Sequence, residues 1–242
     1  MKTILITGAS SGIGAQIAIL YAQNGFTVFA GGRNQERLDE LSSKHENIKT
    51  FTCDLTSKEN IKNINLKFSP LDILLLNAGG CEYIDDAVNF DGDLFARVIT
   101  DNLISVGYCL DVWLKLVKPN GQLAITSSCA SFIPLPRSEA YGASKAALTY
   151  LAKSLAIDLS DANINVSVIH PGFVKTQLTD KNTFDMPCII TSEAAAKYVF
   201  KGLSSYSTEI NFPKRFTYTL KFLAFLPFSI WKNLANKMMK GK

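Results

Sequence analysis

The sequence predicts a doubly wound α/β fold, in which helices cover both faces of a parallel sheet. Short apolar runs alternate with helical patterns at least five times, and the links between them are short. The runs are nearly all apolar, as strands buried on both faces should be. The 242 residues are 47% hydrophobic and 19% charged, which is enough for one substantial core. No linker or repeat divides the chain, so we expect one domain over residues 1–242, with 213–242 as a basic, apolar helical extension.

The elements follow from periodicity and from the residues that end them. Gly25, for example, is a natural stop for the first helix. The runs expected as strands are Lys2–Thr7, Phe26–Gly31, Ile48–Cys53, Leu71–Leu76, Gly121–Ser127 and Ile164–His170. The helices are expected at Ile13–Asn24 and Gln35–Lys44, and at about 57–67, 93–118, 139–161 and 192–204.

Composition excludes several classes of protein. The five cysteines are scattered without metal-ligand spacing, which indicates free thiols in a reducing compartment and no metal site. The apolar stretch that follows Met1 is too short for a signal peptide, so we expect a cytoplasmic protein. The net charge is +4, but no acid follows Glu209 while seven bases do, which leaves −3 for the rest. A mildly acidic body argues against nucleic-acid binding.

A glycine-rich turn follows the first predicted strand. From Thr7 to Gly14 the chain reads TGASSGIG, with the spacing GxxxGxG. Such a turn between a strand and a helix lets the backbone approach a pyrophosphate at the helix N-terminus, as in Rossmann-type domains. The alternative is a tight turn that binds nothing. The residues expected at the pyrophosphate are Gly8, Ser10, Ser11, Gly12, Ile13 and Gly14.

The second predicted strand ends beside Arg33 and Asn34. A site selective for NAD usually has an acid near this point for the ribose 2′-hydroxyl, whereas an arginine accommodates a 2′-phosphate. The acid is missing here, and a guanidinium can bind a phosphate through two hydrogen bonds. The residues therefore favour NADP(H) over NAD(H). A solvated arginine at the start of a helix is the alternative.

A tyrosine and a lysine lie one helical turn apart in Tyr141-Gly-Ala-Ser-Lys145. A phenol ionises near pH 10, and a nearby ammonium is expected to lower that pKa enough for acid–base work. Ser128, thirteen residues earlier, could hold a substrate oxygen. A tyrosine and a lysine at this spacing are common on helices. The pair is evidence for a catalytic site only because it follows the glycine-rich turn in the same chain.

Taken together, these motifs resemble the classical short-chain dehydrogenase/reductase family from residue 3 to about 178. The shared motifs in chain order are TGxxxGxG (Thr7, Gly8, Gly12, Gly14), Asn-Ala-Gly (Asn77, Ala78, Gly79), a serine before Tyr-x-x-x-Lys (Ser128, Tyr141, Lys145) and Pro-Gly-x-Val-x-Thr (Pro171, Gly172, Val174, Thr176). The resemblance implies hydride transfer between a nicotinamide and a carbonyl or carbinol carbon, with Tyr141 passing the proton.

The resemblance also implies individual roles. Asn102 matches a residue that holds a water in a proton relay to Lys145, and Lys145 matches the lysine bonded to the nicotinamide ribose. The implied catalytic residues are Asn102, Ser128, Tyr141 and Lys145. Further cofactor contacts are implied for Asp54 and Leu55 at the adenine, for Asn77, Ala78 and Gly79 along the cleft, and for Pro171, Gly172, Val174 and Thr176 at the carboxamide and phosphates.

The sequence departs from the family pattern in three places. Ser131 replaces a glycine after the catalytic serine, and Ser11 stands where many NADPH-preferring members have a base. A Val-Asp-Gly-Gly-like ending is absent at residues 209–213, which argues against an oxoacyl-carrier-protein reductase. For His170 and Cys129 we favour structural roles over catalytic or redox ones.

The basic tail has two interpretations. Its longest uncharged run, Phe222–Trp231, has ten residues, whereas a spanning helix needs about 20. Aromatic residues flanked by lysines suit a peripheral contact with a membrane surface. A helix packed over the substrate cleft or a partner subunit is the alternative, which the sequence favours.

The leading functional hypothesis is an NADPH-dependent carbonyl reductase or alcohol dehydrogenase for a small apolar substrate. A catalytically idle NADP(H)-sensing protein and an epimerase or dehydratase relative are the alternatives. We expect the stretch Gln177–Ile190 to be mobile and to cover the pocket. The resemblance further implies a homodimer or homotetramer.

Overall fold

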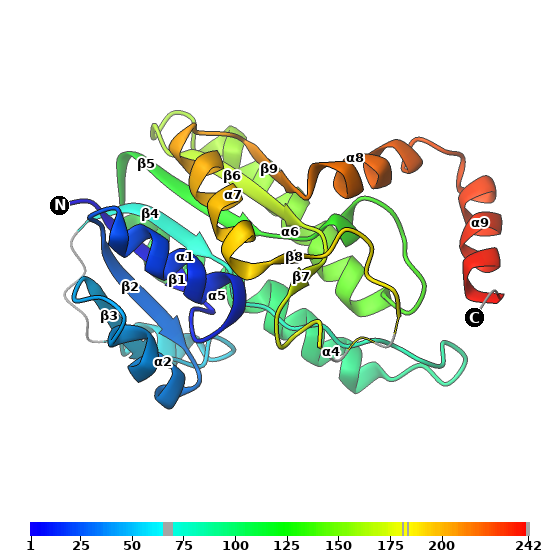
Figure 1. Cartoon of the computed structure of the whole chain (residues 1–242), viewed down its shortest axis with the longest axis horizontal. Helices are drawn as coiled ribbons and strands as arrows, with labels where there is room; N and C mark the ends of the chain where they lie inside the picture. The colour runs from blue at the N-terminus through cyan, green and yellow to red at the C-terminus, as the bar shows by residue number, and fades with distance from the viewer. Residues whose placement is uncertain (65–69, 181, 183, 241–242) are drawn as a thin grey trace.

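The molecule is built around a parallel sheet. The computed structural model describes residues 1–64, 70–180, 182 and 184–240, with only the backbone of residues 238–240. Within these residues seven parallel strands follow the order β3-β2-β1-β4-β5-β6-β9 (Figure 1). The strand order reverses between β1 and β4, and ligands of doubly wound sheets bind at such a switch point. The predicted Rossmann-type fold class is confirmed.

The elements have the following bounds. The main sheet contains β1 (Thr3–Thr7), β2 (Thr27–Gly32), β3 (Ile48–Thr52), β4 (Leu71–Leu76), β5 (Val117–Thr126), β6 (Asn165–Pro171) and β9 (Glu209–Phe212), while β7 (Val174–Lys175) pairs with β8 (Ile190–Thr191). The α-helices are α1 (Gly12–Gln23), α2 (Gln35–Ser42), α3 (Lys58–Lys62), α4 (Gly92–Ile99), α5 (Ser105–Trp113), α6 (Glu139–Asp158), α7 (Ser192–Ser204), α8 (Lys214–Leu223) and α9 (Phe228–Lys240).

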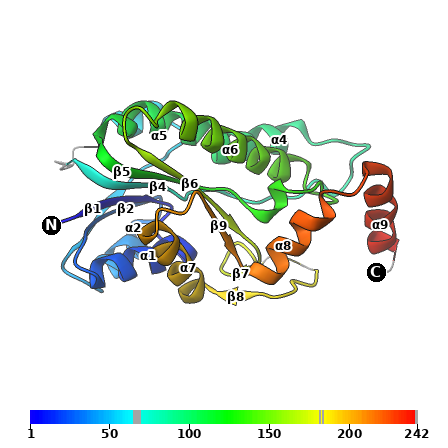
Figure 2. The ribbon, with the colours of Figure 1, turned by 90° about the horizontal axis from the view of Figure 1, so that it is seen from above.

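Alternating side chains of the strands fill two cores. On β1, Ile4 and Ile6 pack with Ile17 of α1 in one core, whereas Leu5 packs with Trp113 of α5 in the other. Figure 2 shows α1, α2 and α7 on one face of the sheet and α5 and α6 on the opposite face. All these side chains are almost completely buried. Both faces of the sheet are therefore covered, and the ends of the strands remain free to carry a site.

The sequence predicted most of this framework. All six predicted strands are present. β4 and α7 have the predicted bounds, and the other five strands have shifted ends. The long helix expected at 93–118 is wrong: a π-helical turn interrupts it at Thr100–Ile104, and β5 already begins at Val117. The helix expected at 57–67 ends at Lys62, and its residues 65–67 lie outside the described residues. Strand β9 was not predicted.

The tail forms two helices after the edge strand β9. Pro227 separates α8 from α9, and α9 stands apart from the sheet at one end of the molecule (Figure 1). No helix in the described ranges is both long and apolar enough to cross a membrane.

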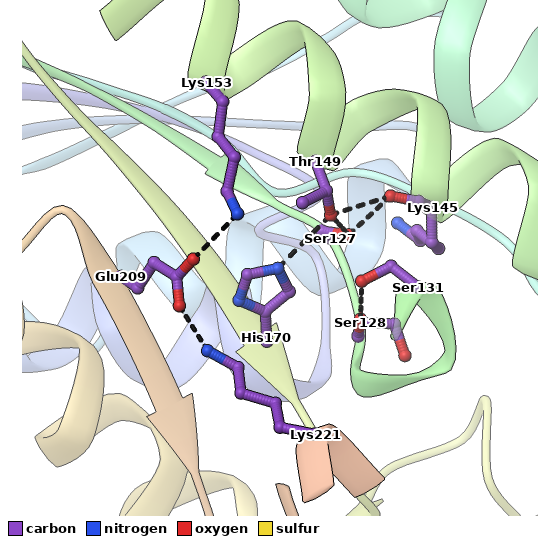
Figure 3. Close-up of polar contacts among 9 residues, drawn as sticks. All are labelled: Ser127, Ser128, Ser131, Lys145, Thr149, Lys153, His170, Glu209 and Lys221. Atoms are coloured by element: carbon purple, nitrogen blue, oxygen red, sulfur yellow. Dashed lines mark hydrogen bonds and ion pairs between the residues drawn. The ribbon is translucent and has the colours of Figure 1, made fainter. Parts of the chain in front are cut away.

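A carboxylate on β9 joins the tail to the long helix α6. Glu209 forms an ion pair with Lys153 of α6 at 3.1 Å and a second one with Lys221 of α8 (Figure 3). Partial burial raises the pKa of Glu209, but the hydrogen bonds from both lysines outweigh that effect and lower the pKa from 4.5 to about 2. The ionised carboxylate therefore stabilises the folded state.

We expect Glu209→Gln to reduce the free energy of unfolding at pH 7 by about 1–2 kcal/mol, a value that allows for solvent screening. Because the folded-state pKa is depressed, this stabilisation is present above about pH 4.5 and is lost as the pH falls toward 2. Urea unfolding across this pH range measures the difference. Glu40→Gln, at an exposed position of α2, is the control and should have little effect. A difference that did not change with pH would contradict the assignment.

Candidate active site

The turn between β1 and α1 requires glycine. Gly8 and Gly12 have φ values of +66° and +57°, and residues with a side chain rarely adopt this backbone conformation. A Cβ atom on Gly8 would lie 2.7 Å from the Cα atom of Ala78, and one on Gly14 would lie 2.3 Å from the carbonyl oxygen of Gly8. The turn is thus packed tightly against the segment after β4.

The N-terminus of α1 is prepared for an anion. Its N-cap residue Ser11 makes no side-chain capping hydrogen bond, whereas Asn34, Ser57, Asp91 and Thr191 cap α2, α3, α4 and α7. The first N–H groups of α1 and its positive dipole end therefore remain available to a ligand. This arrangement fits the pyrophosphate of a dinucleotide.

A cleft of about 410 Å³ opens at this turn, within the usual range for small-molecule sites. Every predicted cofactor residue lines it: Gly8, Ser10, Ser11, Gly12, Ile13, Gly14, Arg33, Asn34, Asp54, Leu55, Asn77, Ala78, Gly79, Tyr141, Lys145, Pro171, Gly172, Val174 and Thr176. Ser128 lines it as well. The sequence analysis missed other lining residues, among them Arg37 and Thr126. Gln177, Leu178 and Thr179 also line the cleft and belong to the stretch that was expected to cover the pocket.

Two guanidinium groups border the part of the cleft at the end of β2. Arg33 is exposed, and Arg37 donates a hydrogen bond from Nη1 to Gln177 Oε1 at 2.5 Å. Asn34 uses its side chain to accept from the backbone N–H of Arg37, so it acts as the N-cap of α2. Arg37 could have been found from the sequence, because it lies in the first turn of the predicted helix that begins directly after Arg33 and Asn34.

Asp54 lines the same cleft and carries a carboxylate. It accepts hydrogen bonds from the backbone N–H of Thr56 at 3.0 Å and from its hydroxyl at 2.8 Å. These bonds, assisted by the charge of Arg33, lower the pKa of Asp54 although its slight burial raises it. Asp54 is therefore ionised at neutral pH.

Asn77 fixes the floor of the cleft where three strands end. The Thr7 hydroxyl accepts from the N–H of Asn77 at 2.9 Å and from that of Ala78 at 3.1 Å. The Asn77 side chain donates to the carbonyl oxygen of Thr7 and accepts from the hydroxyl of Thr126 at 3.3 Å. The ends of β1, β4 and β5 are thereby held together at the switch point.

Lys145 lies on α6, one turn after Tyr141, and is buried with 4% of its surface exposed. Its ammonium donates to the carbonyl oxygen of Thr126 at 3.1 Å and lies 5.7 Å from the centroid of the Tyr141 ring. Burial lowers the pKa of Lys145 to about 8, against an opposing effect of Cys81. The lysine can thus change its charge near neutral pH.

The pKa of Tyr141 differs from the prediction. Burial raises this pKa, and the neighbouring thiol of Cys81 raises it further. A hydrogen bond with Ser128 has the opposite effect but does not outweigh burial. The expected lowering by Lys145 is therefore wrong for this structure, and the phenol is protonated at neutral pH.

Ser128 is held by the turn that follows it. Its hydroxyl accepts from the N–H of Ala130 at 3.1 Å, and its carbonyl oxygen accepts from the hydroxyl of Ser131 at 2.6 Å (Figure 3). Ser131, which departs from the family pattern, therefore braces the serine at the site. Burial raises the pKa of Cys129 to about 12, so its thiol is not ionised at neutral pH.

Asn102 lies behind the cleft and does not line it. It is fully buried in the π-helical turn, where Oδ1 accepts from the N–H of Gly80 at 2.7 Å. Its Nδ2 donates to the carbonyl oxygen of Gly80 at 3.0 Å and to the hydroxyl of Ser144 at 2.9 Å. Because both ends of the amide bind protein atoms, this side chain positions Gly80 and α6.

His170 is also fully buried and lies behind α6. Its Nε2 lies 3.2 Å from the hydroxyl of Thr149, which donates to the carbonyl oxygen of Lys145 at 3.0 Å (Figure 3). Burial lowers the pKa of His170 to about 4, so the ring is neutral. These contacts support the structural role that the sequence favoured.

An apolar wall lies beside Tyr141. Cys81 and Tyr83 perturb the Tyr141 phenol electrostatically. The ring of Tyr83 packs edge-on against Phe184 at 5.7 Å, Phe184 packs on Phe173 at 6.0 Å, and Phe173 packs on Phe216 of α8 at 5.2 Å. The wall therefore joins the segment after β4, the stretch expected to cover the pocket, and the tail. Residues 181 and 183 of that stretch lie outside the described residues.

Comparison with known proteins gives one consistent result. The family model for short chain dehydrogenases matches residues 2–186. An uncharacterized oxidoreductase of Myxococcus xanthus is 30% identical, with 98% of this chain and 97% of that protein covered. A 3β-hydroxysteroid dehydrogenase of Mediterraneibacter gnavus is 34% identical over 80% of this chain and 74% of its own. A 3-oxoacyl-(acyl-carrier-protein) reductase of Rickettsia prowazekii is 37% identical over 74% and 76%.

Solved structures share the fold. A short-chain dehydrogenase from Sphingobium yanoikuyae, in complex with NADPH, has a TM-score of 0.78 at 22% identity and covers 99% of this chain and 94% of its own. A short chain dehydrogenase from Burkholderia cenocepacia, in complex with NADP, has a TM-score of 0.77 at 24% identity, with 87% and 94% covered. With the matched family model and the related sequences, these findings show that the chain belongs to the short-chain dehydrogenase/reductase family of oxidoreductases.

Proposed function

We propose that the protein is an NADP(H)-dependent carbonyl reductase or alcohol dehydrogenase for a small apolar substrate. The observation that carries the proposal is the meeting of Tyr141, Ser128 and Lys145 at a cleft with a glycine turn and an uncapped helix. A protein that only sensed the cofactor would not need a proton donor beside a serine hydroxyl in the cleft. The homodimer or homotetramer implied by the family resemblance stays a prediction.

The side chains suit reduction of a carbonyl group. When bound, the nicotinamide cofactor would supply the hydride chemistry. Tyr141 keeps its proton because burial raises its pKa, and a phenol can pass that proton to the much more basic oxygen of a forming alcohol. Ser128 offers a second hydroxyl to the same oxygen. Lys145 would hold the ribose of the cofactor, and its ammonium lies 5.7 Å from the centroid of the Tyr141 ring.

The choice of NADP(H) rests on charge at the end of β2. Arg33 and Arg37 line the cleft there, and guanidinium groups bind phosphate through charge-assisted hydrogen bonds. Two structural neighbours of the same fold were solved with NADPH or NADP, which supports the same choice.

An apolar substrate follows from the wall beside Tyr141. Aromatic rings offer a large contact surface to an apolar molecule and few hydrogen-bonding groups. The rings of Tyr83, Phe173 and Phe184 would supply this surface. Tyr83 is close enough to Tyr141 to affect its pKa, although none of the three rings is among the residues that line the cleft.

We expect Tyr141→Phe to reduce turnover by about 100- to 10,000-fold, the usual contribution of acid–base catalysis. NADPH affinity should stay nearly constant, because the ring remains and only the hydroxyl is removed. NADPH oxidation over a panel of carbonyl compounds measures the first quantity, and fluorescence titration measures the second. Substantial turnover by the Phe variant would remove Tyr141 from the mechanism. A parent protein that bound NADPH without turning over any carbonyl or alcohol would instead indicate a sensor.

We expect Arg33→Ala and Arg37→Ala each to weaken NADPH binding by about 10- to 100-fold, because each removes hydrogen bonds to a charged phosphate. NADH binding should be nearly unchanged, since NADH has no 2′-phosphate. Lys44→Ala, which removes an exposed charge outside the cleft, is the matched control. Equal affinity of the parent protein for NADPH and NADH would overturn the cofactor assignment.

A further inference from the structure

The tail carries a concentrated group of exposed apolar side chains. Phe222, Phe225 and Phe228 are 71%, 85% and 65% exposed, and Ile230 and Leu234 follow them on α9. Scattered exposed apolar residues are normal, but a contiguous group marks an interaction site. We call the exposed basic and large apolar residues of this segment the tail surface, which comprises Lys214, Arg215, Tyr218, Phe222, Phe225, Phe228, Ile230, Lys232, Leu234 and Lys237.

The tail is held in place by its other side. Thr217 and Leu220 of α8 and Trp231 and Ala235 of α9 are buried. The indole Nε1 of Trp231 donates to the carbonyl oxygen of Pro134 at 2.7 Å. These contacts pack the tail on the segment after Ser128. The packed-helix interpretation placed the tail over the substrate cleft or a partner subunit, and no described residue of α8 or α9 lines the cleft. The packing contacts leave the rings of the tail surface in solvent, so packing on the body explains only part of the tail.

The charge of the tail indicates what covers the rest. No acid follows Glu209, whereas seven bases do. Lys221 pairs with Glu209, but Lys214, Arg215, Lys232 and Lys237 are exposed. Aromatic residues flanked by bases are the composition of segments that lie in the interface of an anionic bilayer. A symmetric contact between two tails would instead bring like charges together, which is unfavourable.

We propose that the tail surface binds the interfacial region of an anionic lipid bilayer. The aromatic rings would enter the boundary between headgroups and acyl chains, and the exposed bases would face the lipid phosphates. The tail then lies on the membrane and does not span it. This inference goes beyond the proposed oxidoreductase function and does not depend on it, since lipid binding can be measured without substrate.

One residue of the tail packs next to the cleft. Phe216 of α8 packs on Phe173 of the apolar wall, and a Cβ on Gly172 would lie 2.9 Å from the Phe216 ring. Gly172 itself lines the cleft. Phe216 therefore connects α8, which carries part of the tail surface, to a residue that lines the cleft.

The test is sedimentation of the full-length protein with vesicles of phosphatidylcholine, with and without phosphatidylglycerol. We expect binding to the anionic vesicles at low salt and release as the salt concentration rises, because ions screen charges over about 10 Å at 0.1 M. Much weaker binding to phosphatidylcholine alone is expected. No sedimentation of the parent protein with anionic vesicles would overturn the proposal.

Two variants separate the contributions. Lys232→Glu with Lys237→Glu should weaken binding at least about thirty-fold, because each base near an anionic surface increases binding roughly five-fold. Phe222→Ser with Phe225→Ser should weaken it about a hundred-fold, since burial of each ring contributes about tenfold or more. Binding that both variants retained would show that another surface is responsible and would overturn the assignment.

Matched controls exclude general effects of charge and folding. Lys197→Glu with Lys201→Glu makes the same charge change at exposed positions of α7, and Tyr206→Asn removes an exposed ring between α7 and β9. Both should bind vesicles as the parent does, and circular dichroism should show that every variant is folded. Equal loss in the controls would contradict the proposal. So would a smaller molecular mass of the Phe222→Ser, Phe225→Ser variant in light scattering without vesicles, which would assign the tail surface to a second copy.

Discussion

The close approach of the glycine turn to the end of β4 is the constraint on which the site depends. With 2.7 Å between a hypothetical Cβ on Gly8 and the Ala78 backbone, the first turn of α1 can lie only beside the switch point. The hydroxyl of Thr7 then accepts from two successive N–H groups of the β4 end. The same contact that orients α1 toward the cleft therefore also fixes Asn77, whose amide reaches the end of β5. The same contacts therefore support both the glycine turn expected to bind the cofactor and the strand end that leads to Ser128.

The catalytic side shows how burial can serve chemistry. Burying an ammonium is unfavourable unless polar groups compensate, and Lys145 has the carbonyl oxygen of Thr126 as its partner. This one partner does not fully compensate for burial, so the pKa of Lys145 is lowered to about 8. The same dry surroundings move the pKa of Tyr141 in the opposite direction. Both shifts favour the uncharged form, so the pair disfavours a phenolate beside an ammonium and stores a transferable proton on the tyrosine.

The parts of the molecule that could be predicted are those encoded locally. The glycine turn and the Tyr–Lys spacing need only neighbouring residues, and the strands of the centre are continuous apolar runs. Strand β9 was missed because Glu209–Phe212 has only four residues, although its alternation of polar and apolar residues is typical of a strand with one buried face. It is completed by its pairing with β6. The pKa of Tyr141 depends on burial by segments distant in the chain, so the spacing to Lys145 alone gave the wrong direction. Arg37, by contrast, could have been predicted as a cleft residue, because it lies in the first turn of the helix that begins after Arg33 and Asn34.

The π-helical turn has a consequence for how this chain can tolerate change. A π turn contains one residue more than an α-helical turn, so deleting a single residue between Thr100 and Ile104 would restore regular i to i−4 bonding. One residue corresponds to a rotation of about 100° around the helix axis. Either the residues before the deletion or those after it would have to rotate, and Asn102 could no longer hold both Gly80 and Ser144. The π-helical turn is thus locally less stable than a regular helix, but it places the Asn102 amide between Gly80 and Ser144. A chain one residue shorter would have a more regular helix and would lose this placement.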